Sequence, residues 1–345
     1  MDRIIEQDCI EYLKKIDITP LYGKTVLITG ANGLIGTYLI YMLHMANVVN
    51  AACINIVAMS KNSPCKAIID IFDHDYEFYS INLNEMDFND LKEKVDYIIH
   101  GATYAQPGKF LRGHLDTIHL NTSVTEKLLK KAMKDNARFL FLSSSEIYGE
   151  PDEVNIPTSE NYPGLCSTVN VRAIYSESKR MGETLCYAYK NFEGVDAKIA
   201  RIAMTYGPGV KLSDERVLAQ FLKQALFDKS IVMLDDGSKV RTFCYIADCV
   251  LMIYNILLYG VDFVYNVGRK GGISIRNLAE EICSLTGSTL EVCPTKNNIE
   301  QNIKVSPQRV ELDTSKICAE FKLEPFKPFK QGLARTIEWN MEDLK

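Results

Sequence analysis

The chain has 345 residues, 47% of them hydrophobic and 24% charged, which are ordinary values for a globular protein. The net charge of -5 provides no basic footprint for nucleic acid, and no stretch approaches the ~20 apolar residues that span a bilayer. The ten cysteines form no C-x-x-C pair, and the N-terminus lacks the apolar block of an export signal. We therefore expect reduced thiols, a cytoplasmic location, and no membrane or nucleic-acid partner.

The first half of the chain alternates between predicted helices and strands. Apolar residues recur at helical spacing near the N-terminus, which predicts a short amphipathic helix there. Strands are predicted over residues 24–30, 54–59, 76–83, 96–102 and 138–144, and one long helix over residues 115–135. This alternation predicts an α/β fold with a doubly wound parallel (Rossmann) sheet covered on both faces.

The pattern loosens after Asn191. A strand is predicted over residues 196–202, a helix over 216–227, a strand over 241–246 and a helix over 247–258. We therefore predict an N-terminal helix and dinucleotide-binding domain over residues 1–204. Residues 205–345 are expected to form mainly a smaller C-terminal α/β lobe, with segments at about 241–260 returning to the first domain.

A glycine-rich segment follows the first predicted strand and opens a helix. It reads G-x-x-G-x-x-G from Gly30 to Gly36. Glycines at this spacing allow a tight turn and let the backbone approach a pyrophosphate at the helix N-terminus. In this position they predict a dinucleotide site rather than a simple turn. The residues expected to bind the cofactor there are Gly30, Asn32, Gly33, Leu34, Ile35 and Gly36.

The second predicted strand lacks the carboxylate that usually holds the adenosine ribose. Ser60 and Lys61 occupy this region instead and could accept a ribose phosphate. The alternative is an exposed turn in which only the serine and the backbone touch the ribose. The residues therefore leave both NAD and NADP open as the cofactor.

Tyr175 and Lys179 form a Y-x-x-x-K pair. Residues four apart share one face of a helix, so the ammonium can lie near the phenol. A nearby cation is expected to lower the phenol pKa, which lets Tyr175 act as a base toward a substrate hydroxyl. The alternative is a surface tyrosine with a lysine neighbour.

Together these motifs resemble the extended short-chain dehydrogenase/reductase family of nucleotide-sugar epimerases, dehydratases and decarboxylases. The resemblance runs from about Lys24 to Trp339 and rests on five segments: "TGANGLIG", "HLNTSVT", "YSESK", "RIAMTYGPG" and "DDGSKVRTFCYIAD". It implies tightly bound NAD (NADP is not excluded), a nucleoside diphosphate sugar in the second lobe, and a homodimer. It also implies that Asn121, Tyr175 and Lys179 contact the cofactor. The five histidines show no metal-ligand spacing, so no metal is expected.

The segment "SSSEIYGE" resembles the family's catalytic loop. The resemblance makes Ser144 the catalytic hydroxyl beside Tyr175 and Lys179, and Glu146 an acid–base residue, with helix capping or solvation as the alternative for Glu146. The residues that it places on the substrate side are Ser145, Arg172, Arg241 and Arg309.

The details of this resemblance are closest to the UDP-glucuronate decarboxylases, and they imply a reaction through a 4-keto sugar. Glu146 disfavours simple epimerisation, while Ser145 and Arg172 favour decarboxylation over 4,6-dehydration. Met204 replaces the family asparagine in R-x-x-N-x-Y-G-P, which leaves the pose of the sugar open. A non-catalytic, cofactor-binding regulatory protein is the alternative from a different class.

Overall fold

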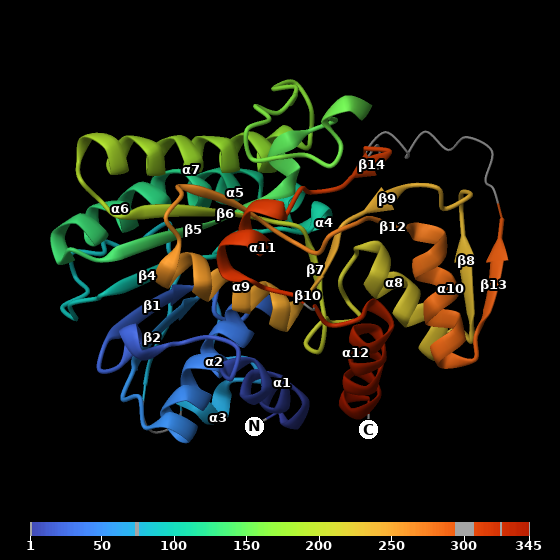
Figure 1. Cartoon of the computed structure of the whole chain (residues 1–345), viewed down its shortest axis with the longest axis horizontal. Coiled ribbons are helices and arrows are strands. Elements are labelled where there is room, and N and C mark those ends of the chain that lie inside the picture. The colour runs from blue at the N-terminus through green and yellow to red at the C-terminus, as the bar shows by residue number, and fades with distance from the viewer. Residues whose placement is uncertain (1, 73–75, 294–306, 325, 345) are drawn as a thin grey trace.

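The computed structural model describes residues 2–72, 76–293, 307–324 and 326–344, and a parallel β-sheet forms its centre (Figure 1). Within these residues the sheet has seven strands in the order β11-β6-β5-β4-β1-β2-β3. They are β1 (Thr25–Thr29), β2 (Asn55–Ser60), β3 (Glu77–Ser80), β4 (Tyr97–His100), β5 (Arg138–Ser144), β6 (Ala197–Ile202) and β11 (Val264–Val267). Every neighbouring pair is parallel. The predicted doubly wound sheet is confirmed, and its order reverses between β1 and β4, where such sheets bind ligands.

Helices cover both faces of this sheet (Figure 1). Val26 and Ile28 of β1 pack in one cluster with α1 (Arg3–Leu13), α2 (Leu34–Asn50) and α9 (Ile246–Tyr259). Leu27, between them, packs in a second cluster with α6 (Ser123–Asp135) and α7 (Ala173–Phe192). Successive residues of a strand point to opposite faces, so the continuous apolar run of β1 serves two cores.

The helix predicted over residues 115–135 is wrong in one respect, because the structure divides it at Thr122. α5 (His114–Asn121) ends before this residue, and α6 begins after it. At Thr122 the backbone has a φ of -119° and a ψ of -79°, outside regular helical geometry, while its hydroxyl and its amide both donate to the Ile118 carbonyl, at 2.7 Å and 3.0 Å. The break leaves Asn121 at the end of α5, which packs against α7.

The second lobe consists of short strand pairs and helices (Figure 1). β7 (Met204–Tyr206) pairs with β10 (Phe243–Tyr245), β8 (Ser230–Met233) with β13 (Thr289–Val292), and β9 (Val240–Arg241) with β12 (Ile273–Ser274) and β14 (Arg309–Val310). Its helices are α8 (Val217–Lys223), α10 (Ile275–Thr286) and α12 (Phe329–Asp343), whereas α11 (Ser315–Phe321) packs against β11 of the central sheet. The strand predicted over residues 241–246 is divided at Thr242, whose amide donates to the Val310 carbonyl and whose hydroxyl accepts from Leu312.

Several short elements complete the described chain. They are α3 (Ile69–Phe72), α4 (Pro107–Arg112), the 3₁₀ turns η1 (Thr19–Leu21), η2 (Ser145–Tyr148) and η3 (Glu153–Asn155), and the π-helical turn η4 (Gln224–Asp228). None of the described helices has both the length and the apolar character needed to cross a membrane.

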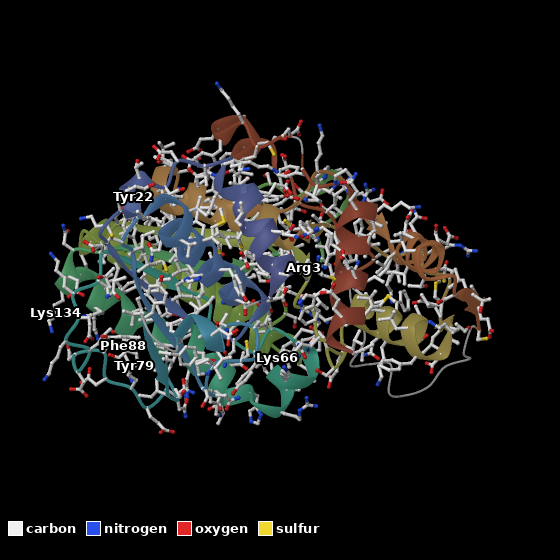
Figure 2. The ribbon with its side chains drawn as sticks, turned by 90° about the horizontal axis from the view of Figure 1, so that it is seen from below. Arg3, Tyr22, Lys66, Tyr79, Phe88 and Lys134 are labelled. Carbon is white, nitrogen blue, oxygen red and sulfur yellow. The ribbon has the colours of Figure 1, made fainter. Side chains whose placement is uncertain are left out.

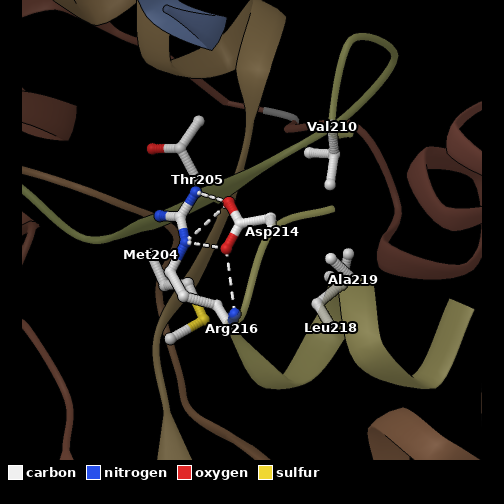
Figure 3. Close-up of a pocket in the computed structure, with 7 residues that line it drawn as sticks. All are labelled: Met204, Thr205, Val210, Asp214, Arg216, Leu218 and Ala219. Atoms are coloured by element: carbon white, nitrogen blue, oxygen red, sulfur yellow. Dashed lines mark hydrogen bonds and ion pairs between the residues drawn. The ribbon is translucent and has the colours of Figure 1, made fainter. Parts of the chain in front are cut away.

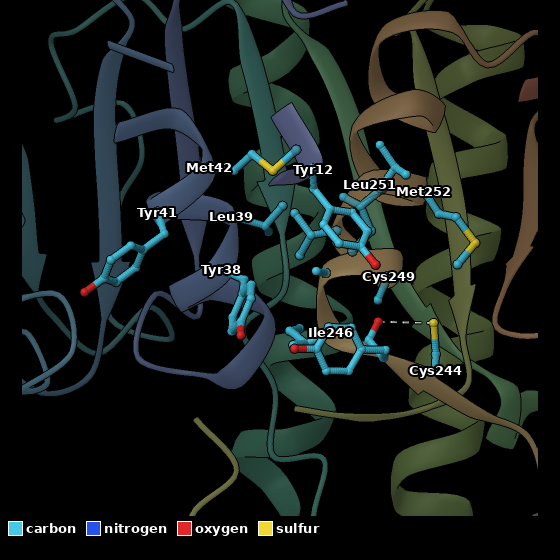
Figure 4. Close-up of a cluster of buried hydrophobic side chains, with 14 of the residues drawn as sticks. Tyr12, Tyr38, Leu39, Tyr41, Met42, Cys244, Ile246, Cys249, Leu251 and Met252 are labelled. Atoms are coloured by element: carbon cyan, nitrogen blue, oxygen red, sulfur yellow. Dashed lines mark hydrogen bonds between the residues drawn. The ribbon is translucent and has the colours of Figure 1, made fainter. Parts of the chain in front are cut away.

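The N-terminal helix α1 is part of the core, as the sequence predicts. Tyr12 is fully buried among side chains of α2 and α9 (Figure 4), and its hydroxyl donates to Asp248 Oδ1 at 2.7 Å. On the outside, Arg3 reaches α12 and pairs with Glu342 at 2.8 Å (Figure 2). α9 packs against α1 and α2, so the chain returns to the first sheet after it has begun the second lobe.

Candidate active site

The glycine loop connects β1 to α2 at the carboxyl end of the sheet. Gly30 has a φ of +80°, which favours glycine. A Cβ on Gly36 would lie only 2.3 Å from the Gly30 carbonyl oxygen. Gly33 is the N-cap of α2, and Leu34 and Ile35 form its first turn. Backbone therefore surrounds the N-terminus of α2 closely, in the arrangement that accepts a pyrophosphate.

Asn32 connects this loop to the segment that follows β2. Its Nδ2 donates to the carbonyl oxygens of Asn62 at 3.1 Å and Ser63 at 2.9 Å, and its Oδ1 accepts from the Cys65 amide at 2.9 Å. These three bonds occupy the side-chain amide of Asn32. The structure thus places Asn32 as a support of the loop, beside the predicted phosphate site.

Ser60 and Lys61 lie at the carboxyl end of β2, where the sequence predicts the ribose site. Ser60 is the last residue of the strand, and Lys61 is exposed. The Lys61 Nζ lies 3.5 Å from the Tyr104 hydroxyl and 3.8 Å from Asp116 Oδ2. Both residues border the same edge of the sheet as the glycine loop, because β1 and β2 are parallel neighbours.

The catalytic-loop segment forms a strand end followed by one tight turn. β5 ends at Ser144, and η2 begins at Ser145. The Ser144 Oγ accepts from the Glu146 amide at 3.2 Å, and Ser144 is 9% exposed. Ser144 therefore caps η2, whereas the Glu146 side chain stays available for other contacts.

Tyr175 lies in the first turn of α7 and is 6% exposed. Burial raises its pKa to about 12, a hydrogen bond with Ser144 opposes this rise, the Glu146 charge adds to it, and the Arg216 charge opposes it. The Tyr–Lys spacing predicts a lowered pKa, so that expectation is wrong here. The physical reason is that desolvation of the phenolate outweighs the Ser144 hydrogen bond and the Arg216 charge.

Lys179 follows one turn later on α7 and is fully buried. Its Nζ donates to the Leu142 carbonyl at 2.6 Å and lies 4.4 Å from the centroid of the Phe141 ring. Burial lowers the pKa of Lys179 to about 7, and the Glu183 charge opposes this effect. The ammonium is thus held against β5, and it is not among the groups that shift the Tyr175 pKa.

Asn121 is completely buried at the end of α5. Its Nδ2 donates to the Ser178 Oγ at 2.9 Å, which joins it to α7 between Tyr175 and Lys179. Within the described part of the chain, its Oδ1 has no hydrogen-bond partner. Buried polar atoms nearly always have a partner, so this oxygen fits a contact with a bound polar group or with water.

Arg172 and Glu146 form the closest ion pair of the site. The Arg172 Nη2 lies 2.6 Å from Glu146 Oε1 and 2.5 Å from Oε2. Arg241 lies within electrostatic range of both: burial lowers its pKa, the Glu146 charge raises it, and the Arg172 charge lowers it. Arg241 also donates to the carbonyl oxygens of Val240 and Pro307, each at 2.6 Å. The structure thus brings these three predicted residues together.

Arg309 does not join this group. On β14 it is paired in register with Val240, whereas Val310 is paired with Arg241. Neighbouring residues of a strand point to opposite faces, so Arg309 and Arg241 project from opposite faces of this small sheet. The Arg309 guanidinium instead pairs with Glu311 Oε2 at 2.6 Å.

Met204 lines a small cavity at the start of the second lobe (Figure 3). The cavity has a volume of about 10 Å³, and an ion pair between Asp214 and Arg216 at 2.6 Å borders it. The thioether thus occupies the position of the family asparagine beside a charged pair. Arg216 is a residue that the sequence reasoning missed, although its charge acts on Tyr175.

Phe110 is a second residue that the sequence reasoning missed. It lies on α4, is 3% exposed, and stacks on the Tyr175 ring with a centroid distance of 5.6 Å and an interplanar angle of 13°. No motif surrounds it in the sequence. Only the path of the chain after β4 places it over the phenol.

Comparisons with known proteins agree with this arrangement. The family model described as "NAD dependent epimerase/dehydratase family" matches residues 26–268. UDP-glucuronic acid decarboxylase 1 of Xenopus tropicalis is 32% identical over 322 residues, which cover 93% of this chain and 73% of that protein. UDP-glucuronic acid decarboxylase 6 of Arabidopsis thaliana is 30% identical over 314 residues, or 89% of this chain and 86% of that protein.

Solved structures show the same fold. UDP-glucose 4-epimerase of Thermotoga maritima superposes with a TM-score of 0.79 at 23% identity, covering 93% of this chain and all of that one. A dTDP-glucose 4,6-dehydratase of Streptomyces venezuelae, solved with NAD, gives 0.79 at 22% identity, with 92% and 97% covered. The glycine cradle at α2 and the buried Asn121 oxygen fit NAD, the cofactor of the family. The chain belongs to the NAD-dependent epimerase/dehydratase family.

Proposed function

We propose that the protein decarboxylates a UDP-glucuronate-like nucleotide sugar through a 4-keto intermediate. The observation that carries this proposal is the position of Glu146 beside Arg172 and within range of Arg241, next to Tyr175. One carboxylate with two guanidiniums leaves a net positive site, which suits a sugar that carries its own carboxylate. The decarboxylase relatives support the same reaction.

The proposed roles follow from these positions. Tyr175 removes the proton from the sugar 4-hydroxyl, and Ser144 hydrogen-bonds the same oxygen. Lys179 is proposed to stabilise the charge that develops, which requires its ammonium to turn from the Leu142 carbonyl. NAD held at the Gly30–Gly36 loop would supply the hydride acceptor and donor for carbon 4. The proton that Tyr175 takes in this step can return to the same oxygen when the ketone is reduced.

The next step distinguishes the reaction from its alternatives. A ketone at carbon 4 makes a carboxylate on carbon 5 a β-keto acid, so carbon dioxide leaves and carbon 5 is then protonated, for which we propose Glu146. In a nucleotide-sugar 4,6-dehydratase the glutamate would instead remove the proton from carbon 5. A 4-epimerase needs neither step.

We assign binding roles to the remaining predicted residues. Gly30–Gly36, Ser60, Lys61 and Asn121 are proposed to contact the cofactor, with Asn32 supporting the loop. The sugar is proposed to lie between Ser145, Arg172 and Arg241, against a lobe that begins near residue 205. Arg309 stays a substrate-side proposal that requires rotation away from Glu311.

Mass spectrometry of products from a panel of nucleotide sugars, including UDP-glucuronate and UDP-glucose, tests this function. Loss of carbon dioxide from UDP-glucuronate is the expected result. Loss of water indicates a dehydratase, and an unchanged mass with altered stereochemistry indicates an epimerase. A native protein that binds NAD but converts none of these sugars favours the regulatory alternative.

We also propose that the protein forms a homodimer in the cytoplasm. Leu115 on α5 and Met181 and Tyr187 on α7 are 59%, 49% and 55% exposed, and apolar helix faces of this kind often pair. All ten cysteines are free thiols, as expected in a reducing compartment. Light scattering at micromolar concentration checks the dimer, and only monomer would contradict it.

A further inference from the structure

Arg172 is fixed by the first turn of α7, whereas its side chain reaches across to η2. Its amide donates to Asn170 Oδ1 at 2.9 Å, and its carbonyl accepts from the amides of Tyr175 at 3.0 Å and Ser176 at 3.1 Å. One nitrogen, Nη2, makes both contacts to the Glu146 carboxylate. The backbone is therefore anchored while a single rotatable group holds the glutamate.

The pair is only partly shielded from solvent. The Arg172 side chain is 22% exposed and that of Glu146 is 39% exposed. The charged and titratable groups near it include Tyr175 on α7, Arg241 on β9 and the Cys166 thiol, which lies 3.8 Å from the Glu146 carbonyl oxygen; Arg216 acts on Tyr175 from the start of α8. A second carboxylate that enters here meets two arginines, one of which already has a carboxylate partner.

We propose that Arg172 is a positioning residue exchanged between two carboxylates, that of Glu146 and that of a bound sugar acid; this inference rests on the proposed function. While Arg172 holds Glu146, its Nη2 group occupies both carboxylate oxygens. When the sugar carboxylate takes Arg172, both Glu146 oxygens are released and one of them can carry a proton from solvent to carbon 5.

The exchange accounts for the timing of proton delivery. Decarboxylation breaks the bond between carbons 5 and 6, and its electron pair enters the enolate of the 4-keto sugar as neutral carbon dioxide leaves. The substrate charge that held Arg172 is then gone, so Arg172 returns to Glu146. The Glu146 proton passes to carbon 5, and the one proton that the reaction consumes has come from solvent through Glu146.

Binding measurements on the NAD-loaded protein test the exchange directly. A Tyr175→Phe background prevents turnover, and calorimetry compares UDP-glucuronate with UDP-glucose. Because Glu146 competes with the sugar carboxylate for Arg172, Glu146→Gln should raise the affinity for UDP-glucuronate by about tenfold, which is about 1.4 kcal/mol of binding free energy. The affinity for UDP-glucose should change by less than about twofold. Arg172→Gln should weaken the affinity for UDP-glucuronate but not that for UDP-glucose. In the double variant with Arg172→Gln, Glu146→Gln should no longer raise the affinity for UDP-glucuronate.

The double variant separates exchange from general electrostatics. If Glu146→Gln tightens UDP-glucuronate equally with and without Arg172, the exchange is refuted. Arg172→Lys controls for folding. Since one nitrogen of Arg172 makes both contacts to Glu146, the lysine should restore most of the preference for UDP-glucuronate. If a folded Arg172→Lys variant binds UDP-glucuronate as weakly as Arg172→Gln does, the exchange is refuted. Arg276→Gln, an exposed arginine on α10 paired with Glu280, should change neither affinity.

The two proposals fail in different ways. If the NAD-loaded native protein binds neither nucleotide sugar, the proposed function fails. If it binds and converts UDP-glucuronate while the ratio of the two affinities does not respond to Glu146→Gln, only the exchange fails.

Discussion

Replacing Glu183 by glutamine should destabilise the fold directly behind the candidate site. Glu183 lies on α7 one turn after Lys179, and its Oε1 accepts from the Ser143 hydroxyl at 2.6 Å and from the Arg201 Nε at 3.1 Å. Its Oε2 accepts from the Arg201 Nη2 at 2.8 Å, and both side chains of the pair are 11% exposed. The substitution keeps the shape and some acceptor capacity but leaves Arg201 buried without its counter-charge. We expect the free energy of unfolding to fall by about 3 kcal/mol.

Chemical denaturation measures this loss as a shift in the unfolding midpoint. The matched control is Glu280→Gln, whose partner Arg276 is half exposed, so its cost should stay below about 0.5 kcal/mol. Equal shifts in the two variants would show that the buried Arg201–Glu183 pair contributes no more to the free energy of unfolding than the exposed Arg276–Glu280 pair. A second readout comes from Lys179, whose pKa is raised by the Glu183 charge against the larger effect of burial. In Glu183→Gln, nuclear magnetic resonance should find the Lys179 pKa lower than in the native protein.

Three further outcomes are expected. Gly36→Ala should weaken NAD binding by roughly 10- to 100-fold, because the added Cβ would lie 2.3 Å from the Gly30 carbonyl oxygen. Gly33→Ala is the control, since its Cβ would lie 3.2 Å from the same oxygen. An equal loss of NAD affinity in both variants, measured by fluorescence titration, would contradict this prediction. Burial lowers the pKa of Lys179 from 10.5 to about 7, so the unfolded chain binds the extra proton between these values. The free energy of unfolding of the native protein relative to Lys179→Met should therefore rise from about pH 7 toward pH 10, and a flat difference in denaturation midpoints would disprove it. Lys61→Ala should leave NAD affinity within about twofold but weaken any NADP binding by about tenfold, as for one lost phosphate contact; an equal loss for both cofactors would remove the proposed phosphate role.

The sequence alone was sufficient for the sheet and its cofactor loop. Short β-branched runs separated by helical periods predict a parallel sheet, because such strands must be buried on both faces. The glycine spacing from Gly30 to Gly36 predicts the turn into α2, since backbone conformation and close approach depend on residues that are local in the chain. Motif spacing likewise predicts the pair Tyr175 and Lys179, and the family resemblance adds Ser144.

Local pattern failed where the backbone departs from regular geometry or where burial sets the chemistry. The helix that periodicity predicts as continuous is divided at Thr122, whose φ of -119° lies outside helical geometry, and the spacing of apolar residues does not report such a break. The Tyr175 pKa is raised rather than lowered, because the cost of burying a charge depends on everything packed around it, including Phe110 from a distant helix.

Only the tertiary structure decided which charged residues meet. Arg172 and Glu146 are 26 residues apart, and no spacing rule predicts their ion pair. Arg241 and Arg309 are both plausible substrate ligands in the sequence, yet the register of β9 with β14 directs them to opposite faces of one small sheet. The physical reason is that motif spacing fixes neighbours within one element, whereas strand register and helix docking, which depend on the whole core, decide the neighbours between elements.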